Sequence, residues 1–502
     1  MSRDIPGGEV LSQTATFLPS RSGATRRPHE GVPVASLWAF GVAALLNWML
    51  AASIETPWTS LTSTALFGWM TYLIFRMDGR AGALLLPFIV NRLAIMISLI
   101  AIEFGASMPE IGRMGEAGAY SASFVVYCAV LLVSAAIVFK TIAPREEGRT
   151  ERASPFGTDL IVVFALGIVA VGALAALYLL AYGASTGFPL LTGTDRFVYR
   201  RFSANTAVLY LLNLKYIMSG LLGWVVFQRR VPATLKLLAA GDFSVLAIAY
   251  FLMGDKFFTN INAIIFFLMP YLLYNWRDAM RRVARLTPVW IVVAGTMFGL
   301  TYYIYSQGFA RGFEETSQRI GERVAGQGEL WFAAVLSGPD LLTWDGVLVE
   351  KNLRVLASST PDVDNLSEGL GTYYFVQRFS PENIVRSVMN NAGTTSLTGG
   401  YEALGLIMFG YLGLAVLMVL TGLLLALLAR YYLYALTLGS PLSIIGAAWL
   451  LTQSFYLTAQ GTPSVMFGLT FAKHYALILA VELVQRAVLS QPLRGSGRAV
   501  RS

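Results

Sequence analysis

The stretch TDLIVVFALGIVAVGALAALYLLAY, residues 158–182, is apolar along almost its whole length and carries a single charged residue, Asp159. A helix needs about 20 consecutive apolar residues to cross the hydrocarbon core of a bilayer, and this run exceeds that length. Similar runs recur along most of the chain, in which 56% of the residues are hydrophobic and 13% are charged. The sequence therefore predicts an all-α polytopic membrane protein.

About twelve transmembrane helices are predicted from the apolar runs between charge clusters. Their expected ranges are 34–54, 58–75, 83–104, 119–139, 158–182, 206–227, 234–253, 258–275, 287–306, 402–428, 432–457 and 464–485. Residues 1–33 are predicted to be a disordered tail without the pattern of a cleaved signal peptide. The expected organisation is then helices one to nine over 34–306, one large hydrophilic loop over 307–400, helices ten to twelve over 401–486, and a tail over 487–502.

The distribution of Lys and Arg predicts the orientation of these helices. Both tails and the loops on their side of the membrane are rich in basic residues, as cytoplasmic segments are. The short loops on the opposite side carry only Arg113, Arg196, Arg200, Arg201 and Lys256. We therefore expect both termini to be cytoplasmic and the 307–400 loop to lie on the outer face.

The composition also disfavours several classes of function. The net charge of +8 is scattered over short loops, which argues against a nucleic-acid partner. The single cysteine, Cys128, excludes a disulfide within one chain. No cluster of Cys, His and carboxylate residues has the spacing of a metal site, and no phosphate-binding loop G-x-x-x-x-G-K-[ST] is present. Neither a metal nor a cofactor is expected.

Three clusters of charged residues lie on the predicted outer face. They are TGTDRFVYRRFSAN (192–205), the turn GDK (254–256), and the start of the large loop, QGFARGFEETSQRIGERVAGQGELWF (307–332). Guanidinium groups keep their charge and bind phosphate through two parallel hydrogen bonds, so arginines in these clusters suit a lipid diphosphate or another anion. The alternative is that they form salt bridges on a solvated face or contact lipid headgroups.

A second group of ionisable residues is predicted to lie inside helices, where charges are costly and usually face a partner or a cavity. They are Arg92, Lys215, Asp242 and Lys473, with His474 beside the last. Lys215 is expected to take part in a buried ion pair or a functional site, and Asp242 is one possible partner. His474 is expected to be a hydrogen-bonded interior histidine.

Four stretches of the chain together resemble the O-antigen (oligosaccharide repeat-unit) polymerases and the related ligases that act on polyprenyl-diphosphate glycans. They are LLTGTDRFVYRR (190–201), YFLMGDKFFTNINAIIFFLMPYLLY (250–274), QRIGERVAGQGELW (318–331) and SLTGGYEALGLIMFGYLG (396–413). The resemblance implies a C-type glycosyltransferase-like fold in the bacterial inner membrane. It also implies that undecaprenyl-diphosphate-linked repeat units are joined at the periplasmic face into O-antigen, capsule or exopolysaccharide, beside a chain-length regulator protein.

The resemblance also implies that arginines of two outer loops bind the diphosphate groups. These are Arg196, Arg200 and Arg201 in the first loop, and Arg311, Arg319 and Arg323 in the second. Lys256 is a further candidate for binding the diphosphate. Transfer needs a base for the acceptor hydroxyl. Glu315 and Glu322 are the leading candidates, with Asp195 and Asp255 behind them.

Four other functions stay open at this point. A flippase for lipid-linked oligosaccharides would line a central cavity with cations such as Arg92, Lys215 and Lys473, although it needs no large outer loop. An O-antigen ligase is expected to use a histidine in that loop, whereas the only histidines are His29 and His474. A membrane acyltransferase and a non-catalytic assembly protein are the remaining alternatives.

Overall fold

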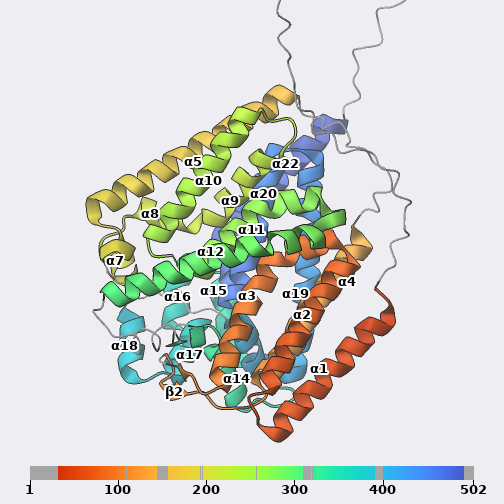
Figure 1. Ribbon diagram of the computed structural model, residues 1–502, viewed down its shortest axis with the longest axis vertical. Coiled ribbons are helices and arrows are strands. Elements are labelled where there is room, and N and C mark those ends of the chain that lie inside the picture. Colours follow the sequence, from red (N-terminus) through yellow and green to blue (C-terminus); the bar gives the residue numbers. More distant parts are fainter. Residues whose placement is uncertain are drawn as a thin grey trace, which may run out of the picture.

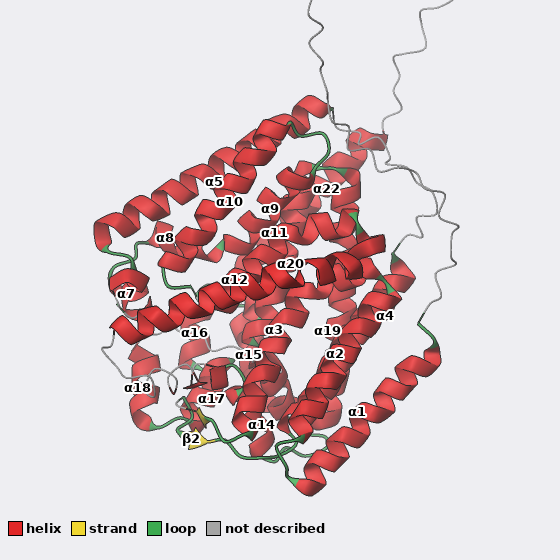
Figure 2. Ribbon diagram, viewed as in Figure 1, coloured by secondary structure: helices red, strands yellow, loops and turns green. Residues whose placement is uncertain are grey.

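The computed structural model describes residues 32–108, 110–143, 157–192, 194, 196–255, 257–308, 318, 321–322, 324–390 and 400–490. Among these residues the secondary structure is helical apart from one two-stranded hairpin, and loops join the helices (Figure 2). The longer helices are α1 Val34–Ile54, α2 Thr59–Met77, α3 Gly79–Glu103, α4 Tyr120–Ile142, α5 Thr158–Thr186, α9 Lys215–Phe227, α10 Ala233–Leu252, α11 Phe257–Tyr274, α12 Ala279–Gly308, α19 Gly400–Leu438, α20 Pro441–Gln460 and α22 Ala472–Ser490.

The shorter elements lie mainly in the connections between these helices. They are α6 Pro189–Thr192, α7 Arg196–Phe202, α8 Thr206–Asn213, η1 Trp276–Asp278, α14 Glu329–Leu336, α15 Gly346–Leu356, α16 Pro361–Ser367, α17 Thr372–Phe379, α18 Glu382–Asn390, α21 Ser464–Phe467, η2 Leu469–Phe471, and the antiparallel strands β1 Ser107–Met108 and β2 Arg113–Met114. Helices α14–α18, here called the cap, gather at one end of the bundle (Figure 1).

Eight helices of the described chain are long and apolar enough to cross a membrane, or nine if the bent pair α8–α9 forms one span. Large apolar side chains cover the outside of several of them. On α1, for example, Trp38 is 72% exposed, and Met49 is exposed as well. Such surfaces are unfavourable in water and favourable in lipid. The protein is therefore an all-α membrane protein, as predicted.

The predicted helix boundary near Arg430 is wrong. Helix α19 continues through Arg430 to Leu438, and α20 begins at Pro441 instead of residue 432. The break falls at Gly439, which has a positive φ of 64°. Ser440 then caps α20 by accepting a hydrogen bond from the Ser443 backbone N–H, and Pro441 occupies the first helical position. Arginine is a good helix former, so its charge alone does not end a helix.

The predicted span 402–428 is not one straight helix, because α19 folds back on itself at Gly410. The hydroxyl groups of Tyr401 and Thr421, which are 20 positions apart in the sequence, are hydrogen-bonded. A straight helix would place two such residues about 30 Å apart. Gly410 adopts φ 69° and ψ −175°, and the cap residue Asp340 accepts a hydrogen bond from the Tyr411 N–H at 3.3 Å. Residues 400–409 therefore form a half-helix packed against the membrane-crossing part of α19.

We expect Gly410→Ala to lower the free energy of unfolding by about 1–3 kcal/mol, because only glycine readily adopts this backbone conformation. The added Cβ would also lie 2.6 Å from the Asp340 carbonyl oxygen. The measurement is the Tm of the purified protein. Gly241→Ala is the control, because its Cβ meets nothing within 4 Å. Equal Tm values for the two variants would contradict the role assigned to Gly410.

The cap is attached to the bundle by buried polar contacts as well as by apolar packing. The Ser98 hydroxyl of α3 donates to the Ala325 carbonyl at 2.5 Å and accepts from the Gly328 N–H at 2.7 Å. The indole N–H of Trp331, on α14, donates to the Tyr120 carbonyl at 2.9 Å. These contacts fix the start of the cap against α3 and α4.

Candidate functional site

Three charged residues from separate parts of the chain meet near the end of the bundle that carries the cap. The Arg200 Nη2 lies 2.7 Å from the Asp255 Oδ1, and the Lys215 Nζ lies 2.7 Å from the Asp255 Oδ2. The Asp255 side chain is only 3% exposed, whereas that of Arg200 is 23% exposed. We call Arg200, Lys215 and Asp255 the cationic cluster, since the three groups together carry a surplus positive charge.

Asp255 is positioned by the way in which α10 ends. Gly254 has a φ of 81°, its N–H donates to the Phe251 carbonyl, and the Asp255 N–H donates to the Tyr250 carbonyl. This pair of hydrogen bonds is a Schellman motif, which requires glycine at its left-handed position. The motif turns the chain sharply and fixes the Asp255 backbone before α11 begins.

Lys215 is positioned by the break between α8 and α9, whose axes differ by 56°. Lys215 is the first residue of α9, where a cation is unfavourable next to the positive end of the helix dipole. Its contact with Asp255 offsets that cost. The Asn213 carbonyl, at the break, accepts a hydrogen bond from the Tyr456 hydroxyl of α20 at 3.1 Å. Breaks of this kind in membrane helices are tolerated where neighbours bind the freed backbone groups.

Arg200 lies on the short helix α7. Residues next to Arg200 in the sequence hold this helix to α5. The hydroxyls of Tyr199 and Thr186 are 2.8 Å apart, and the Tyr182 hydroxyl donates to the Ser203 carbonyl. The Nε of Arg200 is buried and has no hydrogen-bond partner among the described residues. Helix α7 is therefore anchored by Tyr199 and Ser203 in addition to the contact between Arg200 and Asp255.

Aromatic rings line the buried side of the cluster. The Lys215 Nζ lies 5.6 Å from the centroid of the Tyr216 ring, which stacks on Phe266 at 5.2 Å. Tyr456 is 5.6 Å from Tyr216 by ring centroids. Rings beside a cation stabilise it and exclude water, which strengthens electrostatic interactions within the site.

The other predicted site residues are placed only in part. Arg201 is exposed and its guanidinium group lies 5.0 Å from the Phe202 ring centroid. The Arg196 backbone begins α7, but its side chain lies outside the described structure. The remaining candidates outside the described residues are Asp195, Lys256, Arg311, Glu315, Arg319 and Arg323. Their assignments stay predictions.

Glu322 belongs to a different group of residues, the carboxyl groups of Glu110, Glu322 and Glu329 at the start of the cap. It accepts a hydrogen bond from the Gln318 Nε2 at 3.1 Å, and it acts electrostatically on Glu329. The Glu329 carboxyl is fully buried near the backbone of Glu110 and Ile111, and burial raises its pKa to about 9. Glu329 was not predicted, because the sequence shows no sign that this acid is buried.

The ionisable residues that were predicted to lie inside helices have different kinds of partner. Lys215 contacts Asp255 instead of Asp242, whose Oδ2 has no hydrogen-bond partner among the described residues. Arg92 contacts Glu402 at 2.5 Å, and both side chains are fully buried. His474 stacks on Trp449 at 5.0 Å, but its Nδ1 forms no hydrogen bond to a described residue, so the prediction of a hydrogen-bonded histidine is not supported at that atom.

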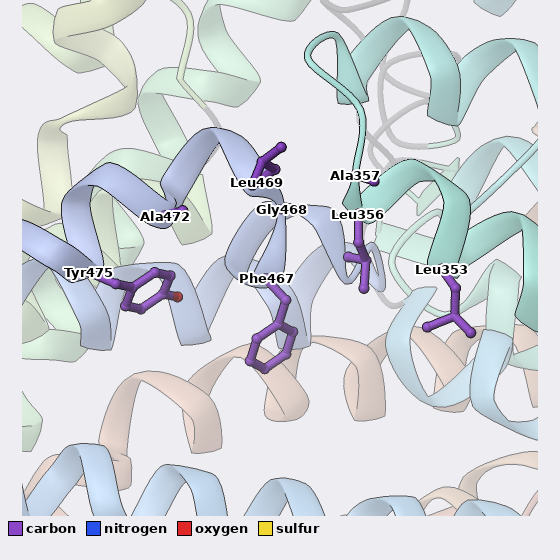
Figure 3. Close-up of a pocket in the computed structure, with 8 residues that line it drawn as sticks. All are labelled: Leu353, Leu356, Ala357, Phe467, Gly468, Leu469, Ala472 and Tyr475. Atoms are coloured by element: carbon purple, nitrogen blue, oxygen red, sulfur yellow. The ribbon is translucent and has the colours of Figure 1, made fainter.

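An apolar pocket of about 410 Å³ lies between α15 and the junction of α21 with α22 (Figure 3). Its lining residues are Leu353, Leu356, Ala357, Phe467, Gly468, Leu469, Ala472 and Tyr475. The one hydroxyl among them, that of Tyr475, donates to the Met466 carbonyl at 2.5 Å. The pocket therefore offers apolar surface and no charged group, and the cationic cluster remains the better site for an anion.

The fold and the cluster define an all-helical membrane protein with a partly exposed arginine in a buried ionic network. Residues 366–473 match the model of a family described as "Family of unknown function (DUF6418)", and the chain is similar to that family over this region. No match was found among curated proteins or solved structures. The matched region contains the folded-back helix α19 and Tyr456, but neither Arg200 nor Asp255. Among the described residues, no group of His, Cys, Asp and Glu could hold a metal ion.

Proposed function

We propose that this protein is a membrane glycosyltransferase that polymerises undecaprenyl-diphosphate-linked oligosaccharide repeat units. The observation that carries the proposal is the cationic cluster, in which Arg200 remains 23% exposed beside the buried Asp255. A guanidinium group in such a place can bind the oxygens of a diphosphate through two hydrogen bonds. It would stabilise the charge that develops as the glycosidic bond to the diphosphate breaks.

The proposal includes a topology of twelve crossings in the bacterial inner membrane, with both termini in the cytoplasm and the cap in the periplasm. Support comes from α2, α11 and α12, which are not among the eight helices selected by length and apolar composition. These three helices nevertheless occupy three of the twelve expected ranges. Arg76 at the end of α2 and Arg80 at the start of α3 flank the turn at the end expected to face the cytoplasm. The cap would then lie where the acceptor glycan arrives.

In this scheme, the arginines hold the leaving diphosphate while a carboxylate removes the proton from the acceptor hydroxyl. Asp255 is occupied by two cations, which supports a role as their counter-ion. Glu315, Glu322 and Asp195 remain the candidate bases. A chain-length regulator is the proposed protein partner.

We expect Arg200→Ala to abolish the long glycan chains, because the variant lacks the group that binds the diphosphate. The measurement is gel electrophoresis of surface glycan from a deletion strain complemented with each variant. The expected pattern is loss of long chains with single capped units retained. Arg386→Ala is the matched control, because this arginine is 73% exposed and pairs with Glu382 on α18.

Other patterns in the same experiment would refute the proposal. Normal-length polymer from Arg200→Ala would contradict the role of Arg200. In the deletion strain itself, lipid-linked units stalled in the cytoplasmic leaflet would indicate a flippase. Long chains that stay on the lipid carrier would indicate a ligase.

A further inference from the structure

The carboxylate of Asp255 sits between two cations in the way that an anionic ligand would. One oxygen is 2.7 Å from the Arg200 Nη2 and the other is 2.7 Å from the Lys215 Nζ. Guanidinium groups bind both carboxylates and phosphates. The two cations are thus already arranged around an anion, which is supplied by the protein itself.

The three side chains differ in how far they reach the surface. The side chains of Asp255 and Lys215 are 3% and 9% exposed, whereas that of Arg200 is 23% exposed. An anion approaching the cluster would therefore meet Arg200 first. The group also carries two positive charges and one negative charge, so the field at Arg200 attracts anions.

The three residues also differ in how firmly they are held. The Schellman motif fixes the Asp255 backbone, and Lys215 is built into the start of α9. Helix α7 is anchored through Tyr199 and Thr186 and through Tyr182 and Ser203, besides the contact of Arg200 with Asp255. The guanidinium group can exchange its partner without releasing α7 from the bundle.

We propose that Asp255 is a built-in counter-anion that a diphosphate displaces from Arg200. On binding, a diphosphate oxygen replaces the Asp255 Oδ1 at the guanidinium group, and Asp255 remains paired with Lys215. This leaves a neutral Lys215–Asp255 pair in the buried part of the site and a second pair between Arg200 and the ligand. Lys215 is a positioning residue in this scheme, because it retains Asp255 after the exchange. The inference rests on the proposed function only in the choice of a diphosphate as the anion.

Two substitutions should change anion affinity in opposite directions. Asp255→Asn removes the competing negative charge, so the Kd for inorganic pyrophosphate should fall about tenfold. Lys215→Met leaves Asp255 with Arg200 as its partner and removes one positive charge, so the Kd should rise by about the same factor. If Asp255 only oriented Arg200 for the ligand, Asp255→Asn would weaken binding instead.

The experiment uses the full-length protein in nanodiscs of a zwitterionic lipid, with binding measured by isothermal titration calorimetry. Asp242→Asn is the matched control, because it makes the same change on the adjoining helix α10 and should leave the Kd unchanged. Lys215→Met keeps the test decisive if Asp255→Asn fails to give a monodisperse protein, because it leaves no buried charge without a partner. Farnesyl diphosphate serves as a second probe: tighter binding than pyrophosphate assigns the site to a lipid-borne diphosphate, and equal binding assigns it to a free one.

The exchange is overturned if Asp255→Asn weakens binding, if Lys215→Met strengthens it, or if neither changes it. Absence of pyrophosphate binding by the unmodified protein and by Asp255→Asn would overturn it as well. These outcomes are independent of the glycan phenotype. Normal polymer length in the Arg200→Ala strain would refute the proposed function, whereas the order of affinities among the variants tests the exchange itself.

Discussion

Glu402→Gln is expected to lower the free energy of unfolding by about 3–5 kcal/mol, since removing one member of a buried ion pair leaves the other without compensation. The Arg92 Nη2 lies 2.5 Å from the Glu402 Oε1, and both side chains are fully buried. Arg92 lies midway along α3, while Glu402 lies on the half-helix of α19. The pair therefore attaches this half-helix to the bundle.

Glu402→Gln and Arg92→Met should not lower the stability equally. A guanidinium group cannot lose its proton in a protein, whereas a carboxylate can become neutral. Glu402→Gln leaves the permanent charge of Arg92 buried without a partner, so it should be worse than Arg92→Met. The double substitution should recover much of the lost stability. The measurement is the Tm of detergent-solubilised protein.

The exposed pair formed by Arg386 and Glu382 provides the control, because surface pairs contribute about 0–1 kcal/mol. Glu382→Gln should therefore leave the Tm almost unchanged. If Arg92→Met lowered the Tm more than Glu402→Gln, the argument from charge retention would be wrong. If neither lowered it, the pair would have no part in holding α19.

The all-α membrane class could be predicted from the sequence, because long apolar runs depend only on composition and length. The predicted range 34–54 coincides with α1, and 206–227 contains the broken pair α8–α9. The fold-back of α19 was missed because residues 401–438 are apolar almost throughout, so periodicity gave no sign of a turn. Gly410 is one of several glycines in this stretch, so it did not mark the turn either.

The members of the cationic cluster were each noticed in the sequence, but their association was not. Arg200 was assigned to an outer loop, Asp255 to a turn and Lys215 to a helix interior. Helical periodicity relates residues along one helix and gives no register between helices. The sequence therefore could not distinguish Asp242 from Asp255 as the partner of Lys215. The same reason explains why Glu402 was not identified as the partner of Arg92. Burial of Glu329 was likewise invisible, since it depends on how α14 packs on α3 and α4.

Glu329 should make the stability of the protein fall as the pH rises. Burial raises the pKa of this carboxyl from its ordinary 4.5 to about 9. Between these values the folded protein binds a proton that the unfolded chain has lost, so unfolding becomes more favourable with increasing pH. The contribution of the neutral carboxyl is fully present below pH 4.5 and is lost as the pH approaches 9. The slope reaches about 1.4 kcal/mol per pH unit for one such proton.

Glu329→Gln removes this proton-binding group and keeps a neutral side chain of similar shape. The variant should therefore have a higher Tm than the unmodified protein at pH 8, and the difference should shrink towards pH 5. Glu350→Gln is the control, because this carboxylate is 71% exposed on α15 and pairs with Arg354. Its Tm should follow that of the unmodified protein at every pH. Parallel curves for Glu329→Gln and the unmodified protein would show that Glu329 is already charged under the cap. Glu110 and Glu322, which act on it electrostatically, would then have to be separated from it by water or by a cation.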